Sequence, residues 1–412
     1  RLNNHGYQAF LVGGGVRDVL LGHTPKDFDI ATDASPDQVK QLFRNCRLIG
    51  RRFRLAHVHF GRDIIEVATF RASHEEADDH DSRAVQEDSG RILRDNIYGD
   101  IGDDVWRRDF TANALYYNID DFSIWDYVDG VEDIRDGVLR LIGDPETRFR
   151  EDPVRMLRAV RFAAKLDFSI HPDTEAQMHA LGALLDGVPA ARLFDESLKL
   201  FLGGHAHASY ELLQRYELFR HLLPVTAEAL EAADGEAFRQ LVVSGLANTD
   251  KRVAEDRPVT PMFLFAVFLW GPIRDHAQVI AEREDANPSH SLRLAAEDII
   301  REQQQSIAVP RRFTMPARDV ICMQPAFERK AHAAAKLMAH PRFRAAYDLM
   351  LLRCEAGEVE PELAQWWTDI QELDDDERKA TLRAEGARSR RRRPRRRRRR
   401  GKRKGGAEPG NG

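Results

Sequence analysis

Cysteine is scarce in this chain, with three residues among 412. Cys46, Cys322 and Cys354 are too few for a disulfide framework, and they do not have the short spacing of a zinc site. A disulfide-rich scaffold and a zinc-finger protein are therefore both excluded. We expect the three thiols to be reduced and structural.

Long hydrophobic runs are also absent. The longest, Met262 to Trp270, is far shorter than the ~20 apolar residues that a transmembrane helix needs. No signal peptide follows Arg1, although the sequence does not begin with methionine. With 42% hydrophobic positions the chain can bury at least two cores, and its length suggests about three domains. We expect a globular, cytoplasmic protein with no membrane association.

Acidic residues are missing from one segment near the end of the sequence. Residues 388–404 contain fourteen Arg or Lys and no Asp or Glu, so that residues 388–412, with Glu408, carry +13. The whole chain carries −5, which leaves 48 basic and 66 acidic residues, or −18, on the first 387. A segment of one charge sign repels itself and cannot bury a core, so we expect it to be disordered.

Three interpretations of this polycationic tail are open. Nucleic acid is the partner that the charge favours, because each neutralised phosphate releases a counterion and gives sequence-independent, salt-sensitive binding. A solvated tail with no specific partner is the second interpretation. The third is an anionic membrane surface, but no amphipathic or lipidation motif accompanies the run.

The hydrophobic pattern divides the chain into a front part with strands and a helical back part, which begins at about Leu141. Residues 72–90 are polar, acidic and without periodicity, which predicts a mobile loop. Ser35 before Pro36 predicts a helix start with Ser35 as the N-cap. The elements expected in the front part are strands at 10–12, 28–31, 57–60 and 64–70 and helices at 16–21 and 36–43.

A triple glycine, Gly13 to Gly15, stands between the first expected strand and the first expected helix. It is not a dinucleotide fingerprint, because Asp18 occupies the last glycine position, and it is not a P-loop, because no Gly-Lys-Ser/Thr follows. A tight turn alone would explain the glycines. Free N–H groups at such a turn also bind phosphate oxygens, and Arg17 can add positive charge.

Two carboxylates, Asp27 and Asp29, follow this turn and are separated by one residue. On a strand both would project from one face, roughly 6 to 7 Å apart at their α-carbons, while Phe28 and Ile30 would face the core. The pair is either an exposed strand end or a site for Mg²⁺, which prefers one or two carboxylates together with substrate phosphates. Glu66, among apolar neighbours, is either a third acid of this cluster or a buried partner for an arginine.

Two further motifs complete an ordered set of four. They are Arg107-Arg108-Asp109-Phe110-Thr111-Ala112-Asn113-Ala114 and Glu151-Asp152-Pro153-Val154-Arg155-Met156-Leu157-Arg158. With the glycine turn and Asp27-Phe28-Asp29, they resemble the motifs of the class II nucleotidyltransferases of the DNA polymerase beta superfamily. That class contains the bacterial poly(A) polymerases and the tRNA CCA-adding enzymes. The resemblance extends in detail over roughly residues 1–205.

This resemblance implies roles around the metal and the phosphates. Asp27 and Asp29 would bind the catalytic Mg²⁺ ions, and Asp109 would act with them as a catalytic acid. Without the resemblance, Asp109 and the two arginines before it could equally form a surface ion pair. The residues that would contact the nucleotide outside its base are Gly13, Gly14, Arg17, Arg108 and Arg158.

The resemblance also implies that Asp152 and Arg155 select the base, by presenting hydrogen-bonding edges to the incoming nucleotide. The local sequence offers a simpler explanation, because Asp152 precedes Pro153 at the start of an amphipathic helix and would be a good N-cap. Arginines that recur every third residue could likewise form a solvated basic stripe. Both roles can coexist, since a capped helix is a rigid support for a base-reading side chain.

Two segments distinguish the members of this class. Residues 48–58 look like the segment that marks bacterial poly(A) polymerases, whereas CCA-adding enzymes have a less basic segment there. The arginine-rich tail also resembles that of the poly(A) polymerases. The arginines that we expect to bind RNA are Arg51, Arg52, Arg54, Arg391 and Arg396.

We therefore expect an α+β fold, with a small mixed or antiparallel-sheet nucleotidyltransferase head, an all-helical RNA-binding body and a disordered basic tail. The expected divisions are a catalytic head at 1–145, a helical nucleotide-selecting neck at 146–205, a helical body at 206–375 and an RNA-binding tail at 376–412.

The expected reaction is template-independent addition of AMP from ATP to RNA 3′ ends, with two Mg²⁺ ions and release of pyrophosphate. A tRNA CCA-adding nucleotidyltransferase and a non-catalytic RNA-binding relative are the alternatives. We expect a monomer whose partners are ATP, RNA 3′ ends and the RNA-decay machinery.

Overall fold

The computed structural model divides the chain into two compact units, Arg1–Arg318 and Asp319–Gly412. The residues that it describes are 1–50, 54–72, 84–86, 92–95, 98–233, 235–285, 287–329 and 331–392.

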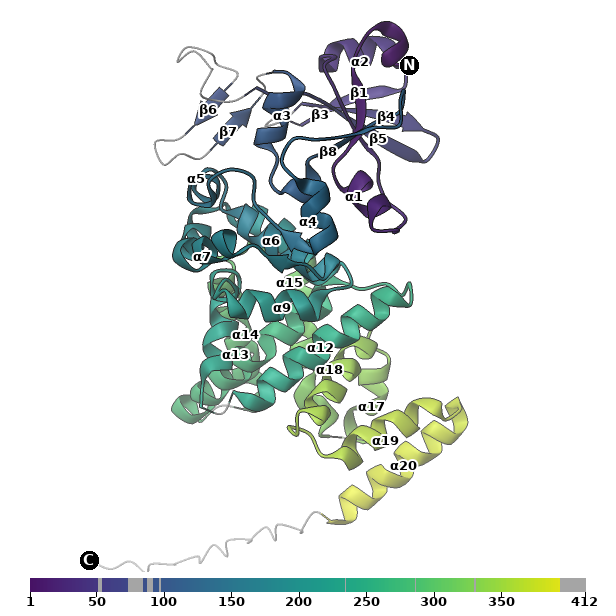
Figure 1. The fold of residues 1–412 in the computed structure, drawn as a ribbon. Helices are drawn as coiled ribbons and strands as arrows, with labels where there is room; N and C mark the ends of the chain where they lie inside the picture. The colour runs from purple at the N-terminus through teal and green to yellow at the C-terminus, as the bar shows by residue number, and fades with distance from the viewer. Residues whose placement is uncertain are drawn as a thin grey trace, which may run out of the picture. The chain divides into compact units, whose positions relative to one another are not determined.

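A seven-stranded sheet forms the front part of the first unit (Figure 1). Its order is β3-β4-β5-β2-β1-β8-β9, and all neighbours are antiparallel except β2 and β5. In β1 alternate residues are buried, and Phe10 packs with Phe70 and Tyr116 in the core. The strands are β1 (Ala9–Val12), β2 (Asp29–Thr32), β3 (Cys46–Ile49), β4 (Leu55–Phe60), β5 (Asp63–Thr69), β8 (Leu115–Asn118) and β9 (Ile124–Asp126).

Short helices connect these strands, and their starts follow from the sequence. The predicted N-cap at Ser35 is confirmed, because its hydroxyl accepts from the Gln38 N–H at 3.3 Å and the Gln38 side chain accepts from the Ser35 N–H at 2.7 Å. Asp100 and Asp103 form the same reciprocal cap. The helices are α1 (Gly14–Leu20), α2 (Pro36–Leu42), α3 (Ile101–Arg107) and α4 (Gly130–Asp136).

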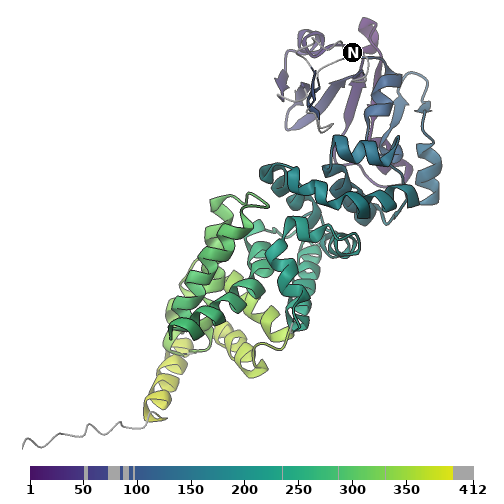
Figure 2. The ribbon, with the colours of Figure 1, turned by 90° about the vertical axis from the view of Figure 1, so that its left-hand side faces the viewer.

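The part of the first unit that follows α4 is helical, apart from the parallel pair β10 (Val138–Leu139) and β11 (Ser169–Ile170). Figure 2 shows these helices, in teal and green, following the sheet of the same unit. The longest apolar run lies in α13, where residues 264–270 are all buried. The helices are α5 (Pro145–Glu151), α6 (Val154–Leu166), α7 (Pro172–Leu181), α8 (Ala190–Phe201), α9 (Ala206–Arg215), α10 (Phe219–Leu222), α11 (Pro224–Glu231), α12 (Glu236–Ala254), α13 (Pro261–Glu284), α14 (Pro288–Gln303) and α15 (Arg311–Cys322).

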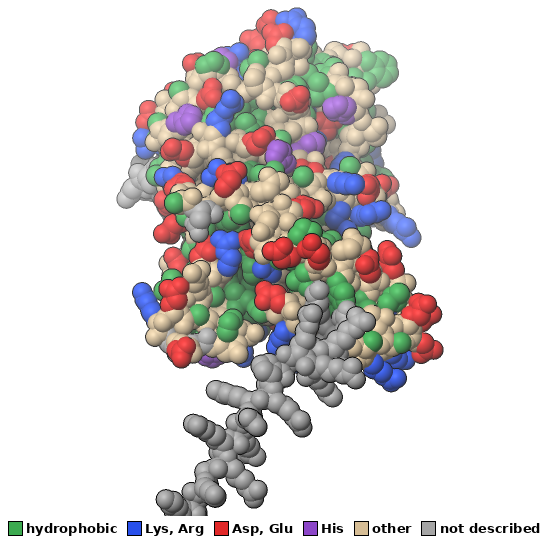
Figure 3. Space-filling model, turned by 90° about the horizontal axis from the view of Figure 1, so that it is seen from below, with side chains coloured by type: hydrophobic (Ala, Val, Ile, Leu, Met, Phe, Trp, Pro, Cys, Tyr) green, Lys and Arg blue, Asp and Glu red, His purple; other side chains and the backbone are tan. Residues whose placement is uncertain are grey.

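The second unit is helical and has a small aromatic core of its own. Trp367 is fully buried, its indole N–H donates to the carbonyl of Phe327 at 3.0 Å, and the two rings lie 4.8 Å apart at their centroids. Figure 3 shows acidic, basic and apolar side chains interspersed over the face that it draws. After α15, the helices are α16 (Gln324–Phe327), α17 (Ala331–Met338), α18 (Phe343–Glu355), α19 (Pro361–Glu372) and α20 (Asp375–Arg392).

The expected α+β class is confirmed by the mixed sheet and the helices that follow it. The expected loop at 72–90 contains a described strand, β6 (Ala84–Gln86), which pairs with β7 (Ile92–Asp95). No helix in the described residues is long and apolar enough to cross a membrane.

The beginning of the expected disordered tail, 376–412, differs from the prediction. Helix α20 extends through Asp375–Arg392. Its first turn holds Asp375, Asp376 and Glu377, and its later residues are basic, so both ends complement the helix dipole. Charge repulsion among the arginines was therefore given too much weight for this part, and residues 393–412 lie outside the described residues.

Candidate active site

A cleft of about 620 Å³ opens in the first unit where the sheet meets helices α1, α3 and α6. All ten residues that we expected to act in catalysis or nucleotide binding line it. They are Gly13, Gly14, Arg17, Asp27, Asp29, Arg108, Asp109, Asp152, Arg155 and Arg158. Segments as much as 145 residues apart in sequence therefore contribute to one site.

The glycine turn presents backbone to this cleft. Gly13 has φ of +70°, a left-handed conformation that other residues rarely adopt, and its N–H donates to the carbonyl of Leu115 at 3.3 Å. A β-carbon added at Gly14 would lie 3.3 Å from the guanidinium of Arg17. The turn thus needs glycine both for its shape and for the close approach of Arg17.

Arg17 is buried beneath the turn and is held by two partners. It forms an ion pair with Asp18 at 2.5 Å and donates to the side-chain oxygen of Asn113. Asp18 also pairs with Lys165 of α6 at 3.1 Å. Burial opposes the charge of Asp18, but Arg17 and Lys165 outweigh it and lower its pKa. The positive groups on this side of the cleft are therefore fixed in position.

The carboxylate pair lies at the start of β2. Asp29 is the first residue of that strand and stands level with Glu66 of the parallel strand β5. Burial and then the charges of Glu66 and Asp27 raise the pKa of Asp29. Asp29 thus lies in the electrostatic field of two other acids, which is an environment that a divalent cation would stabilise.

Phe28 corrects one expectation for this strand. It was expected to face the core with Ile30, but its side chain is 46% exposed. Strand β2 begins at Asp29, so the alternation of faces does not extend back to Phe28. Ile30 packs against the core as expected.

The carboxylate pair fits a magnesium ion better than a metal enclosed by protein ligands. Within the described residues, no three His, Cys, Asp or Glu side chains form a group that could hold a metal. Glu66 lies 3.0 Å from His57 Nε2 on the neighbouring strand. A hard cation such as Mg²⁺ commonly takes only one or two carboxylates from a protein, and Asp27 and Asp29 would be enough for that.

Asp109 lies in the same cleft but is bound to arginine. Its Oδ2 accepts from Arg158 at 2.5 and 2.7 Å, and its Oδ1 accepts from Asn113 at 3.2 Å and from the Phe110 N–H at 2.9 Å. Burial would raise the pKa of Asp109, but these partners lower it to about 2. Asp109 and Arg158 are therefore an ion pair across the cleft wall, in which each fixes the other.

Arg108 is likewise held by an ion pair and a hydrogen bond to neighbouring residues. Its guanidinium pairs with Asp104 at 2.9 Å, and its Nε donates to the hydroxyl of Tyr116 at 2.7 Å. The carbon of the guanidinium also lies 4.8 Å from the centre of the Tyr116 ring. The side chain thus forms part of the cleft wall with a fixed orientation.

The two expected base-reading residues are held by different partners. Asp152 accepts from Arg192 of α8 in a bidentate pair at 2.6 and 2.8 Å, and it also accepts from the Val154 N–H at 3.3 Å. Arg155 pairs with Glu151 at 2.8 Å. Asp152 was expected to be the N-cap of this helix, but α6 begins at Val154 with Pro153 as its N-cap, and Asp152 is the C-cap of α5. Arg192 was not among the expected site residues, although it lies within residues 1–205, over which the sequence resembles this class.

Arg161 differs from the other arginines that line the cleft. Burial and then the charge of Arg158 lower its pKa. Its guanidinium lies 4.5 Å from the centre of the Phe162 ring, and its buried Nε has no hydrogen-bond partner among the residues that the structure describes. An anion entering the cleft would meet this unsatisfied donor.

The expected RNA-binding arginines lie largely beyond what the structure describes. Arg54 pairs with Asp37 at 3.4 Å, and its side chain is exposed. Arg391 falls in α20, where the backbone but not its side chain is described. Arg51, Arg52 and Arg396 lie outside the described residues. Their roles in RNA binding stay predictions.

Three family models match the chain. They are "Poly A polymerase head domain" at residues 9–140, "Probable RNA and SrmB- binding site of polymerase A" at 167–230 and "Polymerase A arginine-rich C-terminus" at 284–403. The chain is 49% identical to Poly(A) polymerase I of Salmonella typhimurium over 93% of its own length and 83% of the relative. It is 37% identical to the CCA-adding enzyme of Leuconostoc mesenteroides, but over only 54% of its own length and 53% of that enzyme.

Solved structures show the same fold at lower identity. An apo form of a CCA-adding enzyme aligns with a TM-score of 0.60 and 21% identity, covering 91% of this chain and 82% of that one. The Thermotoga maritima CCA-adding enzyme complexed with tRNA gives 0.58 and 20%, covering 89% and 78%.

The fold matches that of CCA-adding enzymes, and the chain is a nucleotidyltransferase of the class that these enzymes share with the poly(A) polymerases. Within that class, the full-length identity separates two groups of relatives. The chain belongs to the bacterial poly(A) polymerase family. Its activity is polyadenylation, and CCA-adding enzymes are distant relatives.

Proposed function

We propose that the cleft transfers AMP from ATP to the 3′-hydroxyl of an RNA and releases pyrophosphate. In this step a bond forms between the 3′-oxygen and the α-phosphorus, the bond between the α-phosphorus and the bridging oxygen breaks, and the hydroxyl loses its proton. The observation that carries the proposal is one cleft with two weakly compensated carboxylates on one side and fixed cations on the other.

Asp27 and Asp29 would hold Mg²⁺, which fits the raised pKa of Asp29 beside two other acids. When bound, Mg²⁺ activates the attacking oxygen and neutralises charge on the leaving pyrophosphate. The two aspartates would fix the position of the metal charge, and in this way they would align the 3′ end of the RNA with the α-phosphate.

The triphosphate would lie between the glycine turn and α6. Gly13 and Gly14 keep side chains out of its path, and Arg17 is fixed beside them by Asp18. Arg161 offers an unsatisfied Nε–H donor in the cleft, and Lys165 lines the cleft one turn further along α6. Arg158 contributes positive charge while it remains paired with Asp109. These cations favour binding of the triphosphate and departure of pyrophosphate.

The base would be selected by Asp152 and Arg155. Arg192 holds both oxygens of Asp152, so the carboxylate keeps one orientation and its remaining lone pairs can accept from the exocyclic amino group of adenine. Arg155 is oriented in the same way by Glu151. Selection then depends on a rigid pair of side chains and needs no template.

The RNA would be held outside this cleft by Arg51, Arg52, Arg54 and the arginine-rich tail, through its backbone rather than its bases. The proposed division into head (1–145), neck (146–205), body (206–375) and tail (376–412) gives nucleotide chemistry to the first two segments and RNA retention to the others. A monomeric state, RNA-decay partners and location in the cytoplasm stay predictions.

A single-nucleotide assay tests the proposed reaction. The protein is incubated with a labelled RNA oligonucleotide, Mg²⁺ and one nucleoside triphosphate at a time. We expect a ladder of long tails with ATP. Three-residue C-C-A additions restricted to tRNA would contradict the proposal.

A truncation before Arg388 tests RNA retention separately from chemistry. It should weaken RNA binding and flatten its salt dependence, because the fourteen basic residues of 388–404 are lost. Extension of short primers should survive. Loss of that extension would show that the tail does more than bind polyanions.

A further inference from the structure

A second cavity, of about 350 Å³, lies in the first unit and shares no lining residue with the active-site cleft. Its wall includes the end of α3, the turn between β9 and α4, and the start of α7. The side chains that matter here are Trp106, Tyr127, Asp129, Arg140, His171 and Asp173.

Two aromatic side chains on this wall are unusually open to solvent. Trp106 is 59% exposed and Tyr127 is 47% exposed, so that much of the apolar surface of both residues is in contact with water. Exposed Trp and Tyr that line a cavity are typical of binding surfaces, where they supply large, rigid contact areas.

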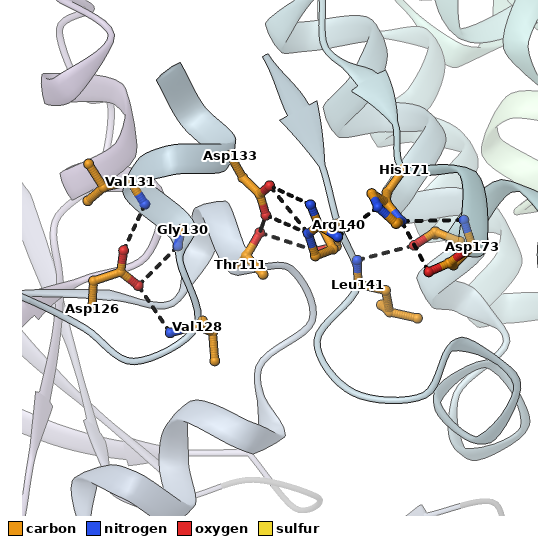
Figure 4. Close-up of polar contacts among 11 residues, drawn as sticks. Thr111, Asp126, Val128, Gly130, Val131, Asp133, Arg140, Leu141, His171 and Asp173 are labelled. Atoms are coloured by element: carbon orange, nitrogen blue, oxygen red, sulfur yellow. Dashed lines mark hydrogen bonds and ion pairs between the residues drawn. The ribbon is translucent and has the colours of Figure 1, made fainter. Parts of the chain in front are cut away.

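The positive charge of Arg140, which lines the cavity, is paired with a carboxylate of the protein itself. Arg140 donates from Nε and Nη2 to the buried carboxylate of Asp133 at 3.1 Å, and from Nη1 to His171 Nε2 at 2.7 Å (Figure 4). A guanidinium can only donate, so Nε2 of His171 accepts this bond. Arg140 is therefore compensated and leaves no net cation at the cavity.

In the described part of the chain, the two acidic residues that line the cavity, Asp129 and Asp173, are not paired with an arginine or lysine in this way. Asp129 precedes α4 but makes no capping bond, because Asp126 accepts from the N–H groups of Val128, Gly130 and Val131 instead (Figure 4). Asp173 lies in the first turn of α7 with its side chain 81% exposed. Both residues line the cavity; Asp129 makes no capping bond, and the carboxylate of Asp173 lies 3.7 Å from Nδ1 of His171.

A further acid adds to this negative field. Burial and then the nearby charge of Asp100 raise the pKa of the Tyr127 hydroxyl. The phosphates of an RNA would be repelled by such a field, even though its bases could stack on the aromatic rings. A guanidinium is attracted by the carboxylates and stacks favourably on the same rings.

We propose that this cavity binds an arginine side chain from a basic segment of a partner protein, with Trp106 and Tyr127 stacking on the guanidinium and Asp129 and Asp173 pairing with it. Charge complementarity identifies the occupant, because among the described lining residues Asp129 and Asp173 are acidic and Arg140 is already paired with Asp133. Asp173 falls in the segment matched by the RNA- and SrmB-binding model, whereas the two aromatic residues and Asp129 fall in the head.

The test measures binding of a fluorescein-labelled hexa-arginine peptide to the full chain by anisotropy. One variant removes a ring, Trp106→Ala, and its control is Phe122→Ala, which removes an exposed ring elsewhere in the head. A second variant, Asp129→Asn with Asp173→Asn, is matched by Asp63→Asn with Glu362→Gln, two exposed acids far from the cavity in sequence. The chain's own arginine-rich segment is present in every variant, so its competition cancels.

We expect W106A to weaken the peptide about fivefold and the double variant about tenfold, with both controls within about twofold of the unchanged protein. Short-primer extension should stay unchanged in all four, which also verifies the fold. Equal weakening by the matched acidic pairs would overturn the proposal in favour of general attraction to an acidic surface. Loss of oligo(A) binding in W106A, with peptide binding intact, would identify an RNA site instead.

Discussion

The two sides of the active-site cleft use aspartate in opposite ways. On the sheet side, Asp29 lies among acids and its pKa is raised. On the helix side, Asp109 and Asp152 are each bound by an arginine, and the pKa of Asp109 is lowered. Acids without a protein partner are suited to a cation that arrives with substrate, whereas paired acids hold the arginines in place. Removing one acid from each side should therefore damage different properties.

The largest effect is expected for Asp29→Asn. Turnover should fall by at least about 10³-fold, equivalent to about 4 kcal/mol in the activation barrier, because a metal ligand is neutralised. The melting temperature should stay or rise, because repulsion with Asp27 and Glu66 is relieved. Single-turnover kinetics and thermal melting measure the two, with Asp63→Asn as control. If Asp29→Asn loses stability and keeps turnover, Asp29 is not a metal ligand and the two sides of the cleft do not differ in this way.

The opposite pattern is expected for Asp109→Ala. Arg158, which is half-buried, would be left without its carboxylate partner, which should lower the free energy of unfolding by roughly 2 to 3 kcal/mol. Urea unfolding measures this loss. Asp109→Ala with Arg158→Met removes both charges and should recover much of the stability. If the double variant is no more stable than the single one, the ion pair does not hold this wall.

The pH dependence of stability should also reflect the ion pair of Asp109 with Arg158. The pKa of Asp109 is about 2 in the folded protein and about 3.9 in an unfolded chain, so its contribution is complete above about pH 4 and is lost as pH falls towards 2. The contribution is roughly 2 to 3 kcal/mol, and Asp29, with its raised pKa, contributes with the opposite sign. Unfolding of the unchanged protein and of Asp109→Asn is compared between pH 4.5 and 2. Parallel curves would contradict the assignment.

The smallest effect is expected for Arg192→Lys. Lysine cannot make the bidentate pair with Asp152, so the carboxylate should lose its fixed orientation and the preference for ATP over CTP should fall about tenfold, or about 1.4 kcal/mol. Ratios of kcat/KM for the two nucleotides measure it. Arg301→Lys, at an exposed pair on α14, is the control. An unchanged ratio would mean that Arg192 only supports the helices.

The elements of the active site could be predicted from the sequence because each is a local pattern. Gly13, Asp27 and Asp29, Arg108 and Asp152 were all recognised by their neighbours, and all line one cleft. The pairing partners could not be predicted in this way. Arg192 lies 40 residues from Asp152, and nothing in the local spacing of either residue specifies the contact.

The fold was predictable to the same extent. Ser35 was recognised as an N-cap because its partner Gln38 is three residues away. Phe28 was misplaced because the end of a strand depends on pairing with other strands, and β2 pairs only from Asp29. The extent of α20 was missed because its acidic first turn precedes the basic run by more than ten residues.

Helix α6 sets the distance between the residues proposed to contact the base and those proposed to contact the phosphates. The cleft residues Arg155, Arg158, Arg161 and Lys165 recur every three or four positions along one of its faces, directly after Asp152. At 1.5 Å per residue, the spacing from Arg155 to Lys165 is about 15 Å. A straight helix cannot shorten that distance. Displacement of α6 along its axis would therefore misplace the base-contacting and the phosphate-contacting residues together. Only a nucleotide whose base and phosphates both fit this spacing would be held in position to react.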